Sequence, residues 1–418
     1  MQIAYNVDST ECSPFSWQSA FSRKRRLMDD SGIRAILGIA SRPGILSFAG
    51  GLPDPKLLPL DEIHECSQNV LRTHGYAALQ YGVADGVGAL AQELSKVSNL
   101  KGADCAPLNV IATTGSQQGI DLIANAFLNH GDPIAVTSPT YLGALQIFSA
   151  FEPRYIQISC DDEGPILADV EAALRQKPAF FYVVSIFQNP TGVTISRKRG
   201  EAIVRMCHVY NVPIVEDAAY QELFYDAEPV SLRVTESAIL QASGRSYEDD
   251  GRVIYLGTLS KVMSPGLRVG WIEAPSTVIR AIACLKQGTD LHSGVMNQYI
   301  AAEFLKTHAE GYWKRIRAAY RERRDQAVES VKKHIGAIAQ SCTTPEGGFF
   351  LWLEVDPKID TAKLLPMSVE EFGVAFAPGA PFFALNPANN TMRLSFSNLS
   401  LEMIEKGINS LGRALRSW

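Results

Sequence analysis

One lysine in this chain lies among residues that would not normally surround it. Lys261 belongs to LGTLSKVMSPGLRVGW (residues 256–271), a run of small and apolar residues in which the next cation is Arg268. A solvated surface lysine usually has other charges around it. Removal from water and a nearby positive charge both favour the neutral amine, which is the nucleophilic form. The stretch therefore indicates a reactive amine, and a lysine that is merely packed is the alternative.

A carboxylate follows a second apolar run. Asp217 lies in VEDAAY (215–220), after the apolar residues VPIV (212–215). A buried carboxylate without a partner is costly, and none of its sequence neighbours is a cation. A protonated nitrogen in the ring of a ligand would supply the missing positive charge.

An anion site is indicated where a predicted strand meets a predicted helix. GSQQG (115–119) follows the apolar run VIATT (110–114) and precedes a stretch with helical spacing. Backbone N–H groups at a helix N-terminus, together with the hydroxyl of Ser116, bind anions such as phosphate. Arg268 would close this site with a bidentate contact. Ser116 as an ordinary helix cap is the alternative.

Two more polar side chains follow predicted strands. Tyr141 in SPTYLGA (138–144) is placed to lie flat on a ligand ring, and the amide of Asn189 in FQNPTG (187–192) is placed to hold a ligand oxygen. A packed tyrosine and a simple turn are the alternatives. Together, these residues specify a ligand with an aromatic ring, a phosphate, a basic ring nitrogen, a ring hydroxyl and an aldehyde. That ligand is pyridoxal 5'-phosphate, whose recognised partners are a lysine and an aspartate.

The elements that must position these residues alternate along the chain. Short apolar runs such as DPIAVTS, RYIQIS, FFYVVSIF and RVIYLGT are separated by stretches with helical spacing. Runs without polar alternation indicate strands buried on both faces, and helices between them indicate parallel crossovers. Reactive segments in such a sheet lie at the carboxyl ends of the strands, which is where the polar residues above fall.

The same pattern predicts an α/β fold with two domains and an arm. We expect a large cofactor-binding domain over residues 49–305, with a mostly parallel sheet between helices, and a smaller α+β domain over residues 306–418. Residues 1–48 are too few for a separate domain. We expect them to form an arm and a helix that pack with the small domain.

Composition excludes several classes of function. The chain has 418 residues, of which 46% are hydrophobic, and a formal net charge of −5, so it has no general attraction to nucleic acid or anionic lipid. No apolar run is long enough to span a bilayer, and the first residues lack a signal-peptide pattern. The cysteines form no C-x-x-C pair and the histidines show no metal-binding spacing. We therefore expect a cytoplasmic protein without a metal site and without nucleic-acid or membrane partners.

The chain resembles the fold-type I pyridoxal-phosphate enzymes of the class I/II aminotransferases. The resemblance is greatest to the subgroup of 2-aminoadipate, kynurenine, aromatic and branched-chain aminotransferases. It extends over residues 31–398 and rests on motifs that occur in the family's order: GSQQG, SPTYLGA, QNPTG, VEDAAY, SKVMSPGLRVGW and RLSF. It implies an aspartate aminotransferase-like fold, a homodimer with active sites at the interface, and ping-pong transfer of an amino group between an L-amino acid and a 2-oxo acid.

The resemblance also implies roles at the cofactor. Lys261 would carry the cofactor as a Schiff base and then move a proton at the substrate α-carbon, while Asp217 keeps the ring nitrogen protonated and Tyr141 stacks on the ring. Asn189 and Tyr220 would bind the ring hydroxyl. The phosphate would be held by Ser116, Gln117, Thr258 or Ser260, and Arg268, with Tyr81 reaching the phosphate of the other subunit.

Substrate contacts follow from the same resemblance. Arg393 in MRLSF would clamp the substrate α-carboxylate beside Asn189, with a strand-edge cation as the alternative. Gly50, Gly51 and Leu52 would line the pocket. Arg34 would meet an acidic substrate side chain, with a solvated helix arginine as the alternative. Two departures from the family pattern bear on the substrate: Ala380 replaces a glycine in APGAPFF, and the preceding segment is short and contains Pro366.

Two other functions fit the same site. The cofactor supplies the electron chemistry and the pocket chooses which bond breaks, so a racemase, a decarboxylase or a C–S lyase is an alternative. A non-catalytic effector-binding domain, as in regulators that fuse this fold to a DNA-binding module, is a further one. The residues leave the amino donor and acceptor open.

Overall fold

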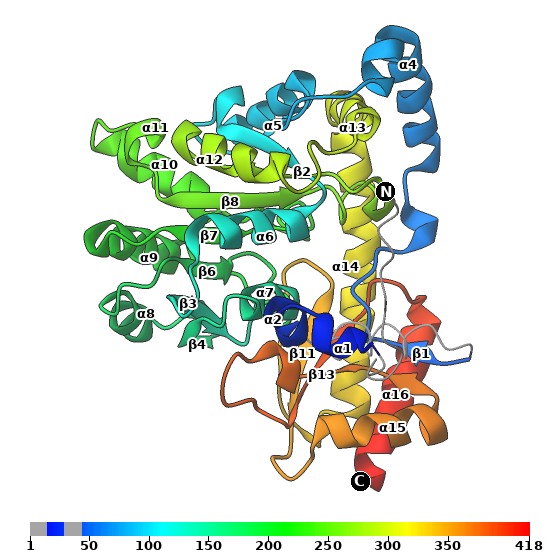
Figure 1. The fold of residues 1–418 in the computed structure, drawn as a ribbon. Helices are drawn as coiled ribbons and strands as arrows, with labels where there is room; N and C mark the ends of the chain where they lie inside the picture. Colours follow the sequence, from blue (N-terminus) through cyan, green and yellow to red (C-terminus); the bar gives the residue numbers. More distant parts are fainter. Residues whose placement is uncertain (1–14, 29–43) are drawn as a thin grey trace, which may run out of the picture.

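The computed structural model describes residues 15–28 and 44–418, and its largest sheet gathers the apolar runs from the middle of the chain (Figure 1). Strands β3, β4, β6, β7 and β8 pair in parallel, whereas β9 is antiparallel to both of its neighbours and β5 is antiparallel to β4. The prediction of a mostly parallel sheet is therefore confirmed. In spatial order the strands are β2 (Val110–Thr113), β9 (Gly270–Glu273), β8 (Val253–Thr258), β7 (Ile214–Asp217), β6 (Phe181–Val184), β3 (Pro133–Ser138), β4 (Arg154–Asp161) and β5 (Gly164–Pro165).

Helices cover both faces of this sheet because its strands are apolar on both faces. Along β6, Phe181 and Val183 belong to one buried cluster, and Tyr182 and Val184 belong to another, as the two-residue period of a strand requires. One cluster includes α6 (Ser116–Phe127), α7 (Leu142–Ser149) and α12 (Ser276–Gln287). The other includes α8 (Leu167–Leu174), α9 (Arg197–Tyr210) and α10 (Leu232–Ala242).

A smaller lobe is built on an antiparallel sheet from the last quarter of the chain. Its strand order is β10 (Ala339–Cys342), β11 (Phe350–Val355), β14 (Thr391–Ser395) and β13 (Ala377–Pro378). The helix α14 runs from the larger lobe along the smaller one (Figure 1). The helices of the smaller lobe are α14 (Ala309–His334), α15 (Thr361–Phe372) and α16 (Leu401–Ser417).

The apolar segment VAFAPG (374–379) is divided between two strands. β12 (Val374–Ala375) pairs in parallel with β1 (Leu46–Ser47), whereas Ala377 and Pro378 pair with β14. Pro366, in the segment that departs from the family pattern, lies inside α15. Proline has no N–H to donate within the helix, and the buried residues around it keep α15 in place.

The described part of the N-terminal arm contacts the larger lobe. The arm contains α1 (Trp17–Ala20) and α2 (Arg23–Leu27). Arg23 pairs with Glu152 at 2.6 Å, and the ammonium of Lys24 lies 5.3 Å from the ring centre of Phe151. These partners lie between α7 and β4, which differs from the expected packing against the small domain. The later strand β1 does join the smaller lobe, and the domain boundaries themselves stay a prediction.

Further helices lie at the end of the larger lobe away from the smaller sheet (Figure 1). Helix α13 (Val295–Thr307) packs against both α4 (Leu60–Leu79) and α5 (Gly88–Leu100). Short 3-10 turns, each with a proline near its start, lie in the connecting loops, and the short helix α11 (Tyr247–Asp250) precedes β8. These turns are η1 (Pro55–Leu57), η2 (Pro107–Asn109), η3 (Pro265–Leu267) and η4 (Ala380–Phe382).

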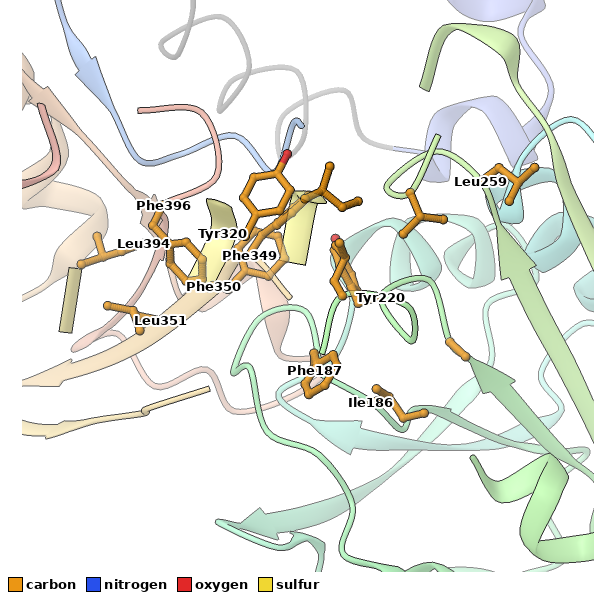
Figure 2. Packing of buried hydrophobic residues seen from close by; sticks show 14 of the residues in the cluster. Ile186, Phe187, Tyr220, Leu259, Tyr320, Phe349, Phe350, Leu351, Leu394 and Phe396 are labelled. Carbon is orange, nitrogen blue, oxygen red and sulfur yellow. The ribbon is translucent and has the colours of Figure 1, made fainter. Parts of the chain in front are cut away.

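Aromatic side chains join the two lobes beside the carboxyl ends of the strands. The ring of Tyr220, just after β7, lies 5.6 Å from each of Phe349 and Phe350 at the start of β11, measured between ring centres. Phe349 in turn lies 4.8 Å from Tyr320 of α14 (Figure 2). The lobes therefore share one buried cluster, and that cluster fixes the wall of the cleft described next.

In the described part of the chain, no helix combines the length and hydropathy that crossing a bilayer requires. The same residues contain no group of three or more metal-binding side chains.

Candidate active site

The carboxyl ends of the large-sheet strands open into a cleft of about 440 Å³ between the two lobes. The polar residues singled out in the sequence come together there, although they lie in widely separated segments of the chain. The lining includes Ser116, Gln117, Tyr141, Asn189, Asp217, Tyr220, Thr258, Ser260, Lys261, Arg268 and Arg393, together with Gly50, Gly51 and Leu52. Their convergence is what the predicted parallel sheet requires.

The turn that leads into α6 is shaped to receive an anion. Gly115 caps the helix with a φ of 82°, a left-handed conformation that favours glycine. A Cβ on Gly270 of β9 would lie only 2.7 Å from the backbone of Gly115. The backbone of β9 is therefore in direct contact with the backbone of this turn. The free N–H groups at the start of α6 therefore face the cleft with no side chain between them and the neighbouring strand.

Side-chain donors complete this anion site from the other side. The guanidinium of Arg268 donates to the Ser260 hydroxyl at 3.2 Å and to the Thr114 carbonyl at 3.1 Å. The Thr258 hydroxyl lies 3.0 Å from that of Ser260 and 3.2 Å from the Val269 carbonyl, which accepts its proton. Helix N–H groups, a serine hydroxyl and an arginine at one point suit a phosphate.

Asp217 is a buried carboxylate with hydrogen bonds but no cation in direct contact among the described residues. Its side chain accepts a hydrogen bond from the Tyr182 hydroxyl at 2.9 Å and one from the Ala219 N–H at 3.3 Å. Burial raises the pKa of Asp217 to about 6, against the opposing effect of these hydrogen bonds and of the Lys261 charge. A cationic ring nitrogen would provide the charge partner that this carboxylate lacks.

The Lys261 amine is held in the cleft and is poised to be neutral. Its Nζ donates to the Gly51 carbonyl at 2.9 Å. Burial lowers the pKa of Lys261 to about 8, and the positive charges of Arg393 and Arg268 act in the same direction, whereas Asp217 raises it. A much larger fraction of this amine than of an ordinary lysine is therefore uncharged near neutral pH, as the composition of its surroundings predicted.

Tyr141 forms one wall of the cleft at the start of α7. Its hydroxyl donates to Gln117 Oε1 at 3.0 Å, and Gln117 Nε2 donates to the Gly143 carbonyl at 3.4 Å. Burial raises the pKa of Tyr141 to about 12, so the phenol is neutral. These contacts orient the tyrosine ring and the Gln117 amide as one unit.

Arg393 is a buried cation rather than a strand-edge one. It lies on β14, between β11 and β13, and its guanidinium carbon is 4.3 Å from the ring centre of Phe350 and 5.0 Å from that of Phe382. Its Nη atoms donate to Asn189 Oδ1 at 2.7 Å and to the Ala49 carbonyl at 2.6 Å. Burial lowers the pKa of Arg393 to about 10, which leaves it charged at neutral pH.

Asn189 links this arginine to the cofactor side of the cleft. Besides accepting from Arg393, it hydrogen-bonds the buried phenol of Tyr220, whose pKa burial raises. The buried Nε of Arg393 has no hydrogen-bond partner among the described residues. A guanidinium held between two rings with one donor free is suited to a carboxylate ligand.

Tyr81 does not line the cleft of its own chain. Tyr81, in the loop after α4, is 80% exposed, and its ring centre lies 5.7 Å from that of His292. Arg34 lies outside the described residues, so its predicted contact with a substrate is not placed. Leu52 lines the cleft but is half exposed, and its carbonyl accepts from Ser397.

Several residues of the cleft were not identified from the sequence. Tyr182 lies on β6, one strand away from Asp217, and its contact depends on the register that pairs Val184 with Asp217. The apolar lining residues Leu142, Val184 and Phe350 were also missed. Position gave a usable signal for Leu142, which directly follows Tyr141, whereas the predicted run FFYVVSIF continues three residues beyond Val184.

The comparisons with known proteins agree with this geometry. Residues 54–411 match the sequence model of the family described as aminotransferase class I and II. A 2-aminoadipate transaminase of Thermus thermophilus is 37% identical over 404 residues, which cover 96% of this chain and 98% of that protein. An aromatic-amino-acid aminotransferase of Thermococcus litoralis is 35% identical over 417 residues, which cover 98% of this chain and 97% of that protein.

A solved structure shows the same fold with a cofactor derivative. The crystal structure of an alpha-aminoadipate aminotransferase from Thermus thermophilus, complexed with N-(5'-phosphopyridoxyl)-L-leucine, matches with a TM-score of 0.87 at 36% identity. The match covers 96% of this chain and 99% of that one.

Proposed function

The chain belongs to the class I and II aminotransferases and is a pyridoxal-phosphate-dependent enzyme, and on that premise we propose that it moves an amino group between an L-amino acid and a 2-oxo acid in a ping-pong sequence. The observation that carries this proposal is the presence in one cleft of a lysine with a lowered pKa, a buried aspartate and a buried arginine. Each supplies a different requirement of transamination: a mobile proton, a charge for the ring nitrogen and a carboxylate contact.

The cleft residues fit the cofactor in size, charge and donor type. When bound, pyridoxal phosphate withdraws electrons from the substrate α-carbon. We assign Asp217 to the ring nitrogen, with Tyr182 orienting the carboxylate, and we assign Asn189 and Tyr220 to the ring hydroxyl. Tyr141 would lie against the ring face. The phosphate would be held by the start of α6 with Ser116 and Gln117, by Thr258 and Ser260, and by Arg268.

We assign the proton transfer to Lys261. Its lowered pKa favours the neutral amine, which is the form that accepts a proton from the substrate α-carbon. The Gly51 carbonyl accepts a hydrogen bond from this amine at 2.9 Å, so the backbone of the substrate pocket also positions the base.

We assign the substrate α-carboxylate to Arg393. The aromatic rings of Phe350 and Phe382 hold its plane, and the guanidinium lines the cleft and stays charged at neutral pH. Asn189 hydrogen-bonds both this arginine and Tyr220. Binding of the carboxylate at Arg393 would therefore affect the hydrogen bonds on the cofactor side of the cleft through Asn189.

The side chain of the substrate would face an apolar wall. Leu52, Leu142, Val184 and Phe350 line the cleft, which suits aromatic and branched-chain amino acids. An acidic side chain such as that of 2-aminoadipate or glutamate would need a further cation, and Arg34 is our candidate. The relatives include a 2-aminoadipate transaminase and an aromatic-amino-acid aminotransferase.

The spectrum of the bound cofactor tests the proposed reaction. Protein loaded with pyridoxal phosphate would be mixed with L-glutamate, L-2-aminoadipate, L-phenylalanine or L-leucine while its visible absorbance is followed. We expect the visible band to disappear with a good donor and to return when a 2-oxo acid is added. The Lys261→Ala variant should show no turnover.

Other outcomes would replace the proposal with a named alternative. An amino acid that is racemised, decarboxylated or cleaved while the visible band persists would identify a different pyridoxal-phosphate reaction. Tight binding of amino acids without any conversion would identify an effector-binding protein.

A further inference from the structure

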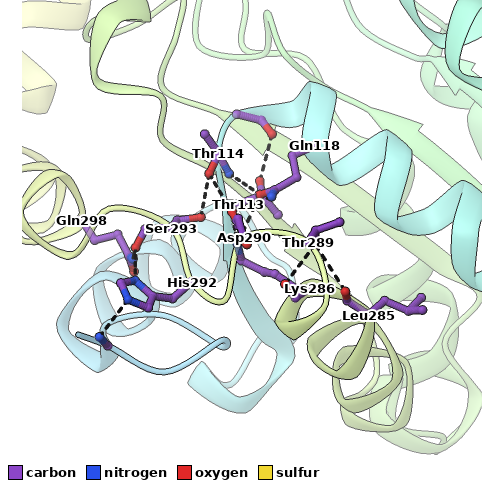
Figure 3. Close-up of polar contacts among 12 residues, drawn as sticks. Thr113, Thr114, Gln118, Leu285, Lys286, Thr289, Asp290, His292, Ser293 and Gln298 are labelled. Atoms are coloured by element: carbon purple, nitrogen blue, oxygen red, sulfur yellow. Dashed lines mark hydrogen bonds and ion pairs between the residues drawn. The ribbon is translucent and has the colours of Figure 1, made fainter. Parts of the chain in front are cut away.

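An ion pair between a buried lysine and a partly exposed aspartate lies behind the proposed phosphate site, outside the cleft. Lys286, on α12, is fully buried, and its Nζ donates to the two carboxylate oxygens of Asp290 at 2.6 and 2.8 Å (Figure 3). A buried ammonium needs such a partner. Charge neutralisation alone would account for Asp290, if its carboxylate had no other contacts.

The same carboxylate also binds both sides of the turn that leads into α6. Asp290 Oδ2 accepts from the Thr114 hydroxyl at 3.2 Å and from Gln118 Nε2 at 2.6 Å. Gln118 Oε1 accepts from the Thr114 N–H at 2.7 Å and from Lys286 at 3.3 Å. The Thr114 carbonyl accepts from Arg268 at 3.1 Å. The ion pair is therefore linked through Thr114 and Gln118 to both the turn and the arginine of the proposed phosphate site.

The contacts continue away from the phosphate site to the loop that carries Tyr81. The Thr114 hydroxyl lies 3.1 Å from that of Ser293. The preceding residue is His292, whose Nε2 accepts a hydrogen bond from the Gly82 N–H at 3.2 Å. Its Nδ1 therefore carries the proton and donates to the Ser293 carbonyl at 2.9 Å. The His292 ring meets Tyr81 edge-on, with 5.7 Å between ring centres.

We propose that Asp290 is a positioning residue that fixes the phosphate-binding turn and ties it to the loop carrying Tyr81. The ligand class is a phosphate dianion, and this inference rests on the phosphate site assigned above. Gly115 gives the turn a conformation that few other residues would hold, and Arg268 is itself exposed, so the turn needs support from outside the cleft. A preorganised site binds more tightly because less order is lost on binding.

Phosphate affinity of the cofactor-free protein tests this role apart from catalysis. We expect Asp290→Asn to weaken binding of both pyridoxal phosphate and inorganic phosphate by about tenfold, the effect of losing a charge-assisted hydrogen bond. The ³¹P resonance of the bound phosphate should also shift. Isothermal titration and ³¹P spectra of the same samples give both readouts.

A double variant separates positioning from charge neutralisation. Asp290→Asn alone leaves Lys286 buried without its partner, whereas Lys286→Met with Asp290→Asn removes both charges. We expect the double variant to recover thermal stability while its phosphate affinity stays about tenfold weaker than that of the unaltered protein. If the affinity recovers together with the stability, Asp290 serves only to neutralise Lys286 and the proposal is wrong.

An Arg268→Met variant distinguishes a failure of this inference from a failure of the proposed site. If Arg268→Met binds phosphate as the unaltered protein does, the assigned phosphate site itself is wrong. If Arg268→Met binds weakly and Asp290→Asn binds normally, the site stands and the role of Asp290 falls.

The link to Tyr81 has its own test. We expect Tyr81→Phe and Asp290→Asn to be non-additive in phosphate affinity, because both act through the same chain of contacts. Additive effects, within a factor of about two, would show that the two residues act independently.

Discussion

Three buried charges set the chemistry of the cleft at the scale of single residues. Burial lowers the pKa of Arg393 to about 10 and that of Lys261 to about 8, and it raises that of Asp217 to about 6. Between these values Asp217 and Arg393 stay charged while Lys261 changes state. The lysine is therefore the group whose protonation decides whether the cofactor-free protein reacts near neutral pH.

The rate of cofactor capture should follow the protonation of Lys261. Only the neutral amine attacks an aldehyde, so we expect the rate to rise with pH and to level off above about 8. Arg393→Met removes a positive charge that lowers the pKa of Lys261. The midpoint of the pH–rate profile should therefore move to higher pH, toward the pKa of an ordinary lysine. Stopped-flow absorbance at a series of pH values measures both profiles.

A distant arginine provides the control for this shift. Arg321→Met removes an exposed cation that pairs with Asp226 on the surface, and it should leave the profile unchanged. A profile that stays in place, or moves to lower pH, in Arg393→Met would show that the arginine does not act on Lys261.

Single residues also mark where sequence reasoning stops. Lys261 and Asp217 could be identified because a charge among apolar residues is conspicuous in a sequence, whereas Arg393 was identified through the resemblance to the family. Tyr182 could not, because its hydrogen bond to Asp217 crosses between strands and depends on their register. The pair of Lys286 and Asp290 has helical spacing, but nothing in the sequence shows that Lys286 is buried.

At the scale of elements, the junctions between strands and helices carry the site. Gly143, in the first turn of α7, shows how tightly one junction is packed. A Cβ at this position would lie 2.5 Å from the Tyr141 ring. The ring can take its place on the cleft wall only because residue 143 has no side chain.

Gly143→Ala should therefore weaken cofactor binding. We expect the Tyr141 ring to be displaced and the affinity for pyridoxal phosphate to fall by about tenfold, which corresponds to about 1.4 kcal/mol. Fluorescence titration of the cofactor-free variant measures the change. Gly311→Ala is the matched control, because that helical glycine has open space around it, and alanine there should stabilise α14 by about 1 kcal/mol.

Strand positions were predictable from sequence because buried strands read as unbroken apolar runs. The antiparallel direction of β9 was not predicted, although the loop length contained the information. Only residues 259–269 separate β8 from β9, and a parallel crossover needs a dozen residues or more. The segment VAFAPG is apolar in both halves, and only the positions of β1 and β14 divide it between two strands.

At the scale of the whole molecule, a group of exposed apolar side chains points to a second copy of the chain. Tyr76 and Leu79 lie near the end of α4, Tyr81 and Val83 lie in the loop that follows, and all four are between 65% and 97% exposed. Contiguous apolar surface of this kind usually marks an interface. We propose a homodimer in which this surface is covered and Tyr81 reaches the phosphate of the partner.

Disrupting this surface should separate the subunits and weaken both sites. We expect Leu79→Lys to shift the protein from dimer to monomer in light scattering, and to reduce pyridoxal-phosphate affinity because Tyr81 is withdrawn. Leu100→Lys changes a leucine at the end of α5 that is 88% exposed, against 73% for Leu79, and serves as the control. A monomeric unaltered protein would contradict the proposed dimer directly.

The pairing of β1 with β12 has a consequence for synthesis. Leu46 and its partner Val374 are more than three hundred residues apart in the chain. At about 5–20 residues per second, a ribosome takes on the order of 15 to 70 s to make the intervening segment. For that time the residues that lead into the substrate pocket have no partner strand, while the sheet that binds the cofactor is already being completed. The large sheet that binds the cofactor can therefore form first. The pairing of β1 with β12, which completes the substrate side of the cleft, can form only near the end of translation.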